Sequence, residues 1–173
     1  VEHVRESVMR LADEVADGAA VIDVADLRRG TATLPDVGMI VLFDPIGGPI
    51  AVSLAEELGP RAVLVTQDNI AGNALARTGD LAPANTRLAQ LGVTIERRTL
   101  LRTVRPIGTG ALEVEVEDRY TGRRRTIPCT AVVDCGFRVP TDPIDAAVQI
   151  GDAVAPRTIL EAVLEGRRAA LAL

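Results

Sequence analysis

Two adjacent glycines, Gly47 and Gly48, stand between an apolar run and a helical pattern in the stretch DPIGGPIA. A glycine turn between a strand and a helix lets the backbone approach a phosphate, and the helix N-terminus adds amide donors and partial positive charge. Ile46 stands where a dinucleotide-binding turn carries its first glycine, which departs from the G-x-G-x-x-G pattern. The stretch therefore indicates either a phosphate site or an ordinary strand-to-helix turn that binds nothing.

A second candidate contact follows the next apolar run, where Thr66 and Asp68 stand in the stretch VTQD. In dinucleotide-binding units an acidic residue about 20 residues after the glycine turn binds the ribose hydroxyls. Asp68 lies 20 residues after Gly48 (68 − 48). The spacing fits, although an Asp after a strand is common, so Thr66 and Asp68 are candidate ribose contacts only in combination with the turn.

The composition limits what this chain can catalyse by itself. All 19 basic residues are Arg, so Schiff-base and P-loop lysine chemistry are excluded. The single histidine, His3, rules out a multi-histidine metal site. Cys129 and Cys135 are six residues apart, which fits neither a C-x-x-C redox pair nor a four-ligand zinc site. We predict no catalytic residue and no metal ligand, and we interpret both cysteines as buried reduced thiols.

The charge and hydropathy patterns narrow the classes of partner. A formal net charge of −5 gives no support for nucleic-acid binding. The basic run Arg123–Arg125 is interpreted as a solvated hairpin tip in preference to a binding patch. No apolar run approaches the roughly 20 residues that a membrane span needs, and no signal-peptide pattern opens the sequence. We therefore expect a cytoplasmic protein without membrane contact.

Three uninterrupted apolar runs predict strands covered on both faces, at Met39–Asp44, Ala62–Thr66 and Ala131–Asp134. A helix beginning near Pro49 joins the first two, which makes a right-handed βαβ unit. Alternation of apolar and acidic residues over 112–117 predicts an antiparallel meander with one solvated face. The predicted fold class is α/β, a Rossmann-like parallel sheet with helices on both faces and a small antiparallel meander.

Other helical patterns complete the expected set of elements. Apolar residues over 4–15 recur at helical spacing, and Gly18 follows as a stop. A helical turn is predicted before Gly30, and a helix over about 83–91. From about Thr158 the sequence predicts an amphipathic closing helix with Ile159, Val163 and Leu164 along one side.

Longer stretches of the sequence resemble a known family. VGMIVLFDPIGGPIAVSLAEELGPRAVLVT, followed later by IGDAVAPRTILEAVLEGRRAALAL, is similar to the C-terminal nucleotide-binding region of the trimethylamine dehydrogenase and 2,4-dienoyl-CoA reductase family, the NADH:flavin oxidoreductases related to old yellow enzyme. VADLRRG and AVVDCG also match stretches of that region. The resemblance covers about Ile22 to Leu173 and implies a glutathione-reductase-type nucleotide-binding domain.

In that family an NAD(P)H-type domain interrupts an FAD-type domain. The resemblance therefore implies that residues 38–136 form the NAD(P)H-type Rossmann-like domain. Residues 1–37 would be the N-terminal segment of the interrupted FAD-type domain, and 137–173 its return segment with the closing helix. Gly151 and Asp152 occupy the Gly-Asp position that approaches the flavin nucleotide. The implied cofactors of this chain are FAD, ADP or NAD(P)H.

Family members carry FMN on a TIM barrel and hold a 4Fe-4S cluster with cysteines next to it, and the chain contains neither part. The resemblance places both groups on a missing N-terminal region or on a barrel-bearing flavoprotein subunit, with a homo-oligomer as a further possibility. The implied function is a nucleotide-binding subunit or C-terminal fragment of an FMN-dependent oxidoreductase, of the amine dehydrogenase/demethylase or enoate reductase type. The alternative is a non-catalytic assembly module with a vestigial dinucleotide site. Ile46 favours the amine dehydrogenases, which do not use NAD(P)H, or the vestigial site.

Overall fold

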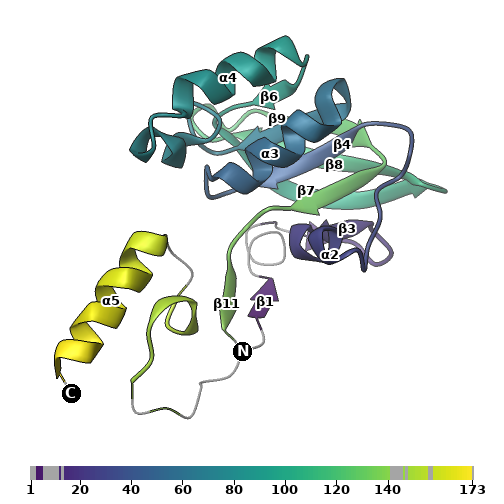
Figure 1. The fold of residues 1–173 in the computed structure, drawn as a ribbon. Helices are drawn as coiled ribbons and strands as arrows, with labels where there is room; N and C mark the ends of the chain where they lie inside the picture. Colours follow the sequence, from purple (N-terminus) through teal and green to yellow (C-terminus); the bar gives the residue numbers. More distant parts are fainter. Residues whose placement is uncertain are drawn as a thin grey trace. The chain divides into compact units, whose positions relative to one another are not determined.

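The computed structural model describes residues 3–5, 12, 14–140, 146, 148–155 and 158–172 (Figure 1). The chain divides into a larger compact unit, Ser7–Gly136, and a smaller one made of Val1–Glu6 and Phe137–Leu173. The described residues of 14–37 belong to the larger unit.

Five parallel strands form the central sheet of the larger unit. In sheet order they are β3 (Val21–Asp23), β10 (Ala131–Asp134), β4 (Ile40–Asp44), β5 (Ala62–Thr66) and β6 (Thr94–Glu96). Every residue of β4, β5 and β10 is buried, as the uninterrupted apolar runs predicted. The α/β fold class inferred from sequence is therefore confirmed.

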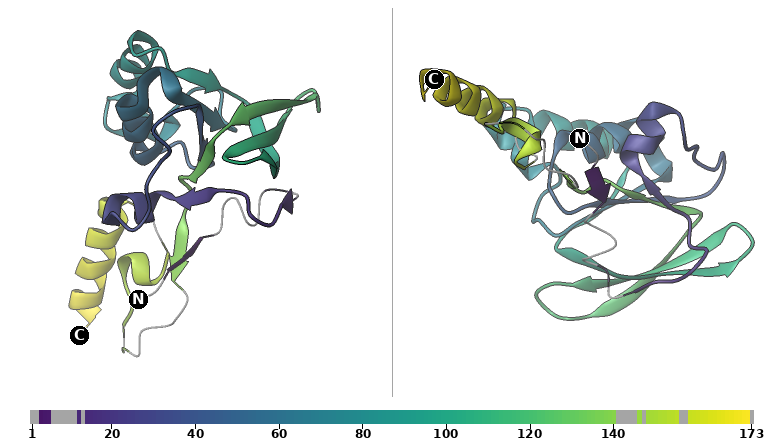
Figure 2. Two further views of the ribbon diagram at one scale, coloured as in Figure 1. Left: turned by 90° about the vertical axis from the view of Figure 1, so that its right-hand side faces the viewer. Right: turned by 90° about the horizontal axis from the view of Figure 1, so that it is seen from below.

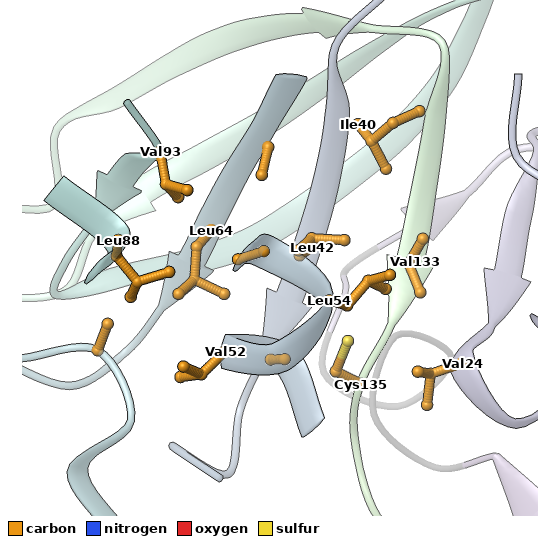
Figure 3. Packing of buried hydrophobic residues seen from close by; sticks show 14 of the residues in the cluster. Val24, Ile40, Leu42, Val52, Leu54, Leu64, Leu88, Val93, Val133 and Cys135 are labelled. Atoms are coloured by element: carbon orange, nitrogen blue, oxygen red, sulfur yellow. The ribbon is translucent and has the colours of Figure 1, made fainter. Parts of the chain in front are cut away.

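Helices cover one face of this sheet. They are α2 (Val24–Arg29), α3 (Pro49–Leu58) and α4 (Leu81–Gln90), with 3-10 turns η1 (Gly59–Arg61) and η2 (Asn73–Arg77) between them. Pro49 suits the first helical position because its missing N–H would have no partner there. Figure 3 shows Val52 and Leu54 of α3 among the side chains of Leu42, Leu64 and Val133 from the sheet. This cluster is the first of two hydrophobic cores.

A four-stranded sheet covers the second face (Figure 2). Its order is β2 (Glu14–Val15), β7 (Thr99–Gly108), β8 (Ala111–Asp118) and β9 (Arg124–Cys129). Val114 and Val116 of β8 pack against Val41 and Phe43 of β4, because alternate residues of a strand point to opposite faces. In the described residues the predicted meander thus supplies the cover that was expected from a second layer of helices.

The helix predicted over 4–15 is wrong wherever the structure can be compared with it. The described residues there form β1 (His3–Arg5) and β2, while residues 6–11 and 13 lie outside the described part of the chain. β2 pairs in parallel with β7, with Glu14 opposite Thr103 and Val15 opposite Val104. Cross-strand pairing along the edge of the meander outweighs the helical spacing, because local propensity is a weak prior.

The smaller unit holds a two-stranded antiparallel ribbon, a 3-10 turn and the closing helix. β1 pairs with β11 (Arg138–Pro140), η3 spans Gly151–Ala153, and α5 spans Ile159–Ala172. α5 begins within one residue of the predicted start at Thr158. None of its described residues is buried, and Ile159 is 83% exposed.

Candidate functional site

A buried carboxylate lies beneath the glycine turn. Asp44, the last residue of β4, is 1% exposed, and its Oδ1 accepts hydrogen bonds from the N–H of Ile46 at 3.1 Å and of Gly47 at 2.9 Å. An Asp that binds the backbone N–H groups two and three residues ahead folds the chain into a tight turn. The sequence analysis assigned Asp44 only to a strand. Its position three residues before Gly47, at the end of an apolar run, is the signal that could have found it.

The buried environment of Asp44 raises the pKa of its carboxyl group. Burial raises the pKa of the carboxyl from its ordinary value of 3.8 to about 6, against the opposing effect of the Gly47, Ile46 and Gly48 backbone N–H groups. The Asp68 carboxylate contributes a smaller increase. Oδ2 of Asp44 is buried and has no hydrogen-bond partner in the described part of the chain. An ionised, partly unsatisfied carboxylate in this position costs stability above pH 6.

Gly47 is required by the turn itself. Its φ of 71° favours glycine, and a Cβ there would lie 2.7 Å from Oδ2 of Asp68 and 3.3 Å from the backbone N of Asn73. The Gly47 carbonyl accepts a hydrogen bond from Ala74 N–H at 2.8 Å. The loop that follows β5 therefore closes onto the turn that follows β4, and the predicted site residues Gly47 and Asp68 come together.

Gly48 differs from its neighbour because the fold itself does not require a glycine there. It is the N-cap of α3 with φ −95°, and a Cβ on it would meet only Cγ2 of Ile46, at an ordinary 3.6 Å. No side chain caps the first turn of α3, and that turn contains no acidic residue. Uncapped N–H groups at a helix N-terminus attract anions.

The two ribose candidates occupy different environments. Thr66 is fully buried, and its hydroxyl oxygen accepts a hydrogen bond from the Asp68 N–H at 3.3 Å. Asp68 is only partly buried. Gln67 between them donates its side-chain N–H to the Pro45 carbonyl at 2.9 Å, a second link between the loop and the turn. Asp68 is accordingly the member of the pair with a side chain that a ligand can reach.

These contacts test how well the turn fits a dinucleotide. A pyrophosphate cradle uses the backbone N–H groups of the glycine turn, yet those of Ile46 and Gly47 already donate to Asp44. The carboxylate of Asp44 thus takes the place of an anion. The first turn of α3 has no side-chain cap, and Asp68 lies close to the glycine turn.

Gly151 and Asp152 belong to the smaller unit and form a separate candidate contact. Gly151 has φ 62°, and its N–H donates to Oε2 of Glu165 on α5 at 2.7 Å. Its carbonyl accepts from the N–H of Val154 at 2.9 Å, which closes η3. Asp152 is exposed. The Gly-Asp pair is thereby held against the closing helix, with its acidic side chain at the surface.

The cysteines lie away from solvent. Burial raises the pKa of Cys129 to about 11, and that of Cys135 well above its ordinary value, with Asp44, Asp134 and Asp23 adding to the latter shift. Among the described residues no group of three or more His, Cys, Asp or Glu side chains could hold a metal ion. None of the helices in this part of the chain combines the length and apolar content needed to cross a bilayer.

Comparison with known proteins places the fold. No protein-family model and no curated protein matches the sequence. Among solved structures, histamine dehydrogenase from Rhizobium sp. 4-9 matches 99% of this chain with a TM-score of 0.82 and 25% sequence identity. The 6-hydroxypseudooxynicotine amine oxidase from Pseudomonas geniculata N1 matches 88% of the chain, with a TM-score of 0.74 and 21% identity.

A more distant match indicates how widely the fold occurs. Thioredoxin reductase from T. acidophilum matches 79% of this chain and 51% of its own, with a TM-score of 0.56 and 16% identity. This chain spans 29% of the length of the histamine dehydrogenase and 24% of that of the amine oxidase. It therefore has the α/β fold of a region within larger oxidoreductases.

Proposed function

We propose that this chain is the nucleotide-binding module of a flavin-dependent oxidoreductase of the amine-dehydrogenase type. The observation that supports the proposal most strongly is the match to histamine dehydrogenase over 99% of the chain, which includes both units. Because the chain spans 29% of that enzyme, the FMN, the 4Fe-4S cluster and the substrate pocket would lie on another region or on a barrel-bearing subunit.

The residues of this chain would bind and position a nucleotide and would not react. The uncapped N-terminus of α3 and the open position at Gly48 would take one phosphate, and Asp68 would accept hydrogen bonds from the ribose. Gly151 and Asp152 would contact an FAD or ADP moiety from the smaller unit. A bound flavin or nicotinamide would supply the redox chemistry, which none of the side chains of this protein provides.

The occupied turn favours ADP over NAD(P)H, because ADP can place its terminal phosphate alone above Gly48, whereas both phosphates of a dinucleotide lie between two nucleosides. A dinucleotide needs the N–H groups of the turn for its pyrophosphate, and Asp44 already holds two of them. A nucleotide that places one phosphate above Gly48 leaves these hydrogen bonds intact. This arrangement supports an enzyme that does not use NAD(P)H as its redox partner.

Calorimetric titration with ADP, NADH and NADPH tests this function. We expect ADP to bind and Gly48→Val to remove the binding event at the turn, because the new side chain would occupy the phosphate position while the ordinary φ of −95° keeps the turn folded. Arg105→Gln is the control, since Arg105 lies on β7 and not at the turn. Absence of heat at millimolar ADP, or an ADP isotherm that Gly48→Val leaves unchanged, would reject nucleotide binding at the turn.

The second candidate function is an assembly module with a vestigial site. It is favoured by Asp44, which satisfies the turn internally, and by the exposed apolar residues of α5, where Leu160 is 63% and Val163 62% exposed. We would then expect the chain to bind a barrel-bearing flavoprotein subunit, or a second copy of itself, without a nucleotide. Light scattering after size-exclusion chromatography, with and without that subunit, measures the mass of the particle and so tests for assembly. A monomeric mass that does not change when the subunit is added would reject the assembly function.

A further inference from the structure

An open pocket of about 620 Å³ lies where β6 ends and β7 begins, beside the turn between β8 and β9. Its charged lining consists of Arg97, Arg98, Arg123, Arg125, Glu96 and Asp118. Four guanidinium groups face two carboxylates, in a chain whose formal net charge is −5. The basic run over 123–125, interpreted from sequence as a solvated hairpin tip, contributes two of these four cations.

The carboxylates of the pocket neutralise only part of the positive charge of its arginines. Glu96 is neutralised by Arg125 at 2.5 Å. Asp118 accepts hydrogen bonds from the backbone N–H of Tyr120 at 3.0 Å and of Thr121 at 2.9 Å, which lower its pKa, and it lies 3.9 Å from Arg98.

Arg97 and Arg123 form no ion pair within the described part of the chain. Two cations in one concave surface without counter-charges favour an anionic ligand.

Arg98 has a left-handed backbone conformation, which is stabilised by two backbone hydrogen bonds. Its φ is 54°, the single positive value among the described residues that are not glycine. Its N–H donates to the Asp68 carbonyl at 2.9 Å, and its carbonyl accepts from Arg119 N–H at 2.8 Å. The guanidinium groups of Arg98 and Arg119 each lie 5.7 Å from the centre of the Tyr120 ring. Such strain is concentrated at functional positions, and here it fixes Arg98 at the rim of the pocket.

The pocket also lies at the carboxyl edge of the parallel sheet, beside its edge strand β6. Ligands occupy the carboxyl ends of parallel strands, and Glu96 is the last residue of β6. Arg119 donates to the carbonyl of Gln67, directly after β5, at 2.9 Å. The volume falls within the range of about 300–1,000 Å³ that small-molecule sites occupy.

We propose that this pocket binds the phosphate groups of a small phosphorylated ligand through Arg97, Arg98 and Arg123. The planar guanidinium group matches phosphate oxygens with two parallel N–H bonds, and arginine is the residue that proteins favour for such contacts. The site is separate from the turn at Gly47 and Gly48 and does not depend on the function proposed for that turn.

The single tyrosine provides a direct readout. The sequence has no tryptophan, so the fluorescence of the protein comes from Tyr120, which contacts Arg98 and Arg119. Pyrophosphate does not absorb where tyrosine does, and its titration should change this fluorescence saturably. ADP and adenosine are then titrated by calorimetry, and we expect heat from ADP but not from adenosine.

Arg97→Gln combined with Arg123→Gln should weaken pyrophosphate and ADP binding by about tenfold or more. Both residues are exposed and form no ion pair with any described residue, so circular dichroism should show an intact fold. Arg105→Gln removes one positive charge outside the pocket, half of what the double variant removes, and should change the affinity less than about twofold at 150 mM salt.

Three results would overturn the proposal. Neither pyrophosphate nor ADP binds the wild-type protein, or Arg105→Gln weakens binding as much as the double variant, which would indicate diffuse attraction. In the third result, Gly48→Val abolishes ADP binding while the double variant leaves it unchanged. That outcome would place the phosphate at the turn and support the function proposed for it, so the two proposals fail separately.

Discussion

The turn after β4 and the pocket after β6 stand at the same carboxyl edge of one parallel sheet, with opposite electrostatic character. At the turn, a buried carboxylate on Asp44 satisfies the backbone N–H groups that could hold an anion. At the pocket, Arg97 and Arg123 have no counter-charge within the described residues. The comparison shows that a glycine motif indicates where an anion can approach, whereas the distribution of unpaired charge indicates where one is needed.

The largest effect on the free energy of unfolding is expected from replacing Gly47. The same substitution at Gly48, where a side chain has room, serves as the comparison. Gly47→Ala forces a side chain into φ 71° and within 2.7 Å of Oδ2 of Asp68, and should lower the free energy of unfolding by about 2–4 kcal/mol. Gly48→Ala meets only Ile46 at 3.6 Å and should cost about 1 kcal/mol or less. Urea denaturation measures both. Equal losses would show that the turn does not distinguish its two glycines.

The next effect concerns the buried charge of Asp44. Its folded pKa, about 6, lies above its ordinary 3.8, so the folded state binds the proton more tightly. The stability that this group contributes is fully present below about pH 4 and is lost as the pH rises through about 6, by about 2–3 kcal/mol in total.

Asp44→Asn keeps an oxygen for the N–H groups of Ile46 and Gly47 and removes the charge. The difference in free energy of unfolding between wild type and variant should therefore shift in favour of the variant from about pH 4 to about pH 7 and then level off. Chemical denaturation at several pH values gives this curve. A flat difference would show that Asp44 has no raised pKa.

The two thiols, one in each hydrophobic core, provide a test of intermediate size. Cys129 and Cys135 are buried, and burial raises the pKa of both. The thiolate is the reactive form, so labelling with a thiol reagent at pH 8 should be slow in the folded protein and rapid in denaturant. Fast labelling of either cysteine in the native state would show that the core around that residue opens readily.

The smallest effects distinguish two neighbouring arginines of the hairpin. Arg124 pairs with Glu115 at 3.1 Å and Glu117 at 2.9 Å, so Arg124→Gln should lower the free energy of unfolding by about 0.5–1 kcal/mol. Arg123 has no ion pair in the described structure, and Arg123→Gln should change that free energy by no more than about 0.3 kcal/mol. Thermal unfolding of the two variants compares them. A larger loss for Arg123 would assign it a structural role and weaken the case for an anion pocket.

Sequence reasoning performed best where one physical cause dominates. The uninterrupted apolar runs at 40–44, 62–66 and 131–134 could form only strands buried on both faces. Pro49 and the glycine before it indicated the start of α3 correctly. The helical spacing over 4–15 misled, because two short strands there are stabilised by partners more than 80 residues away, β7 and β11.

The sequence by itself determined the buried strands, the helices between them and the absence of lysine and multi-histidine chemistry, because these follow from residue type and periodicity. It also singled out Gly48, and the pair Gly47 and Asp68, whose contact the structure shows. Only the tertiary structure decided that Asp44 fills the turn and that Arg97 and Arg123 share one pocket. Burial and unpaired charge depend on which segments meet in space, and Arg97 meets Arg123 across 26 residues of sequence (123 − 97) because β7, β8 and β9 fold back on one another.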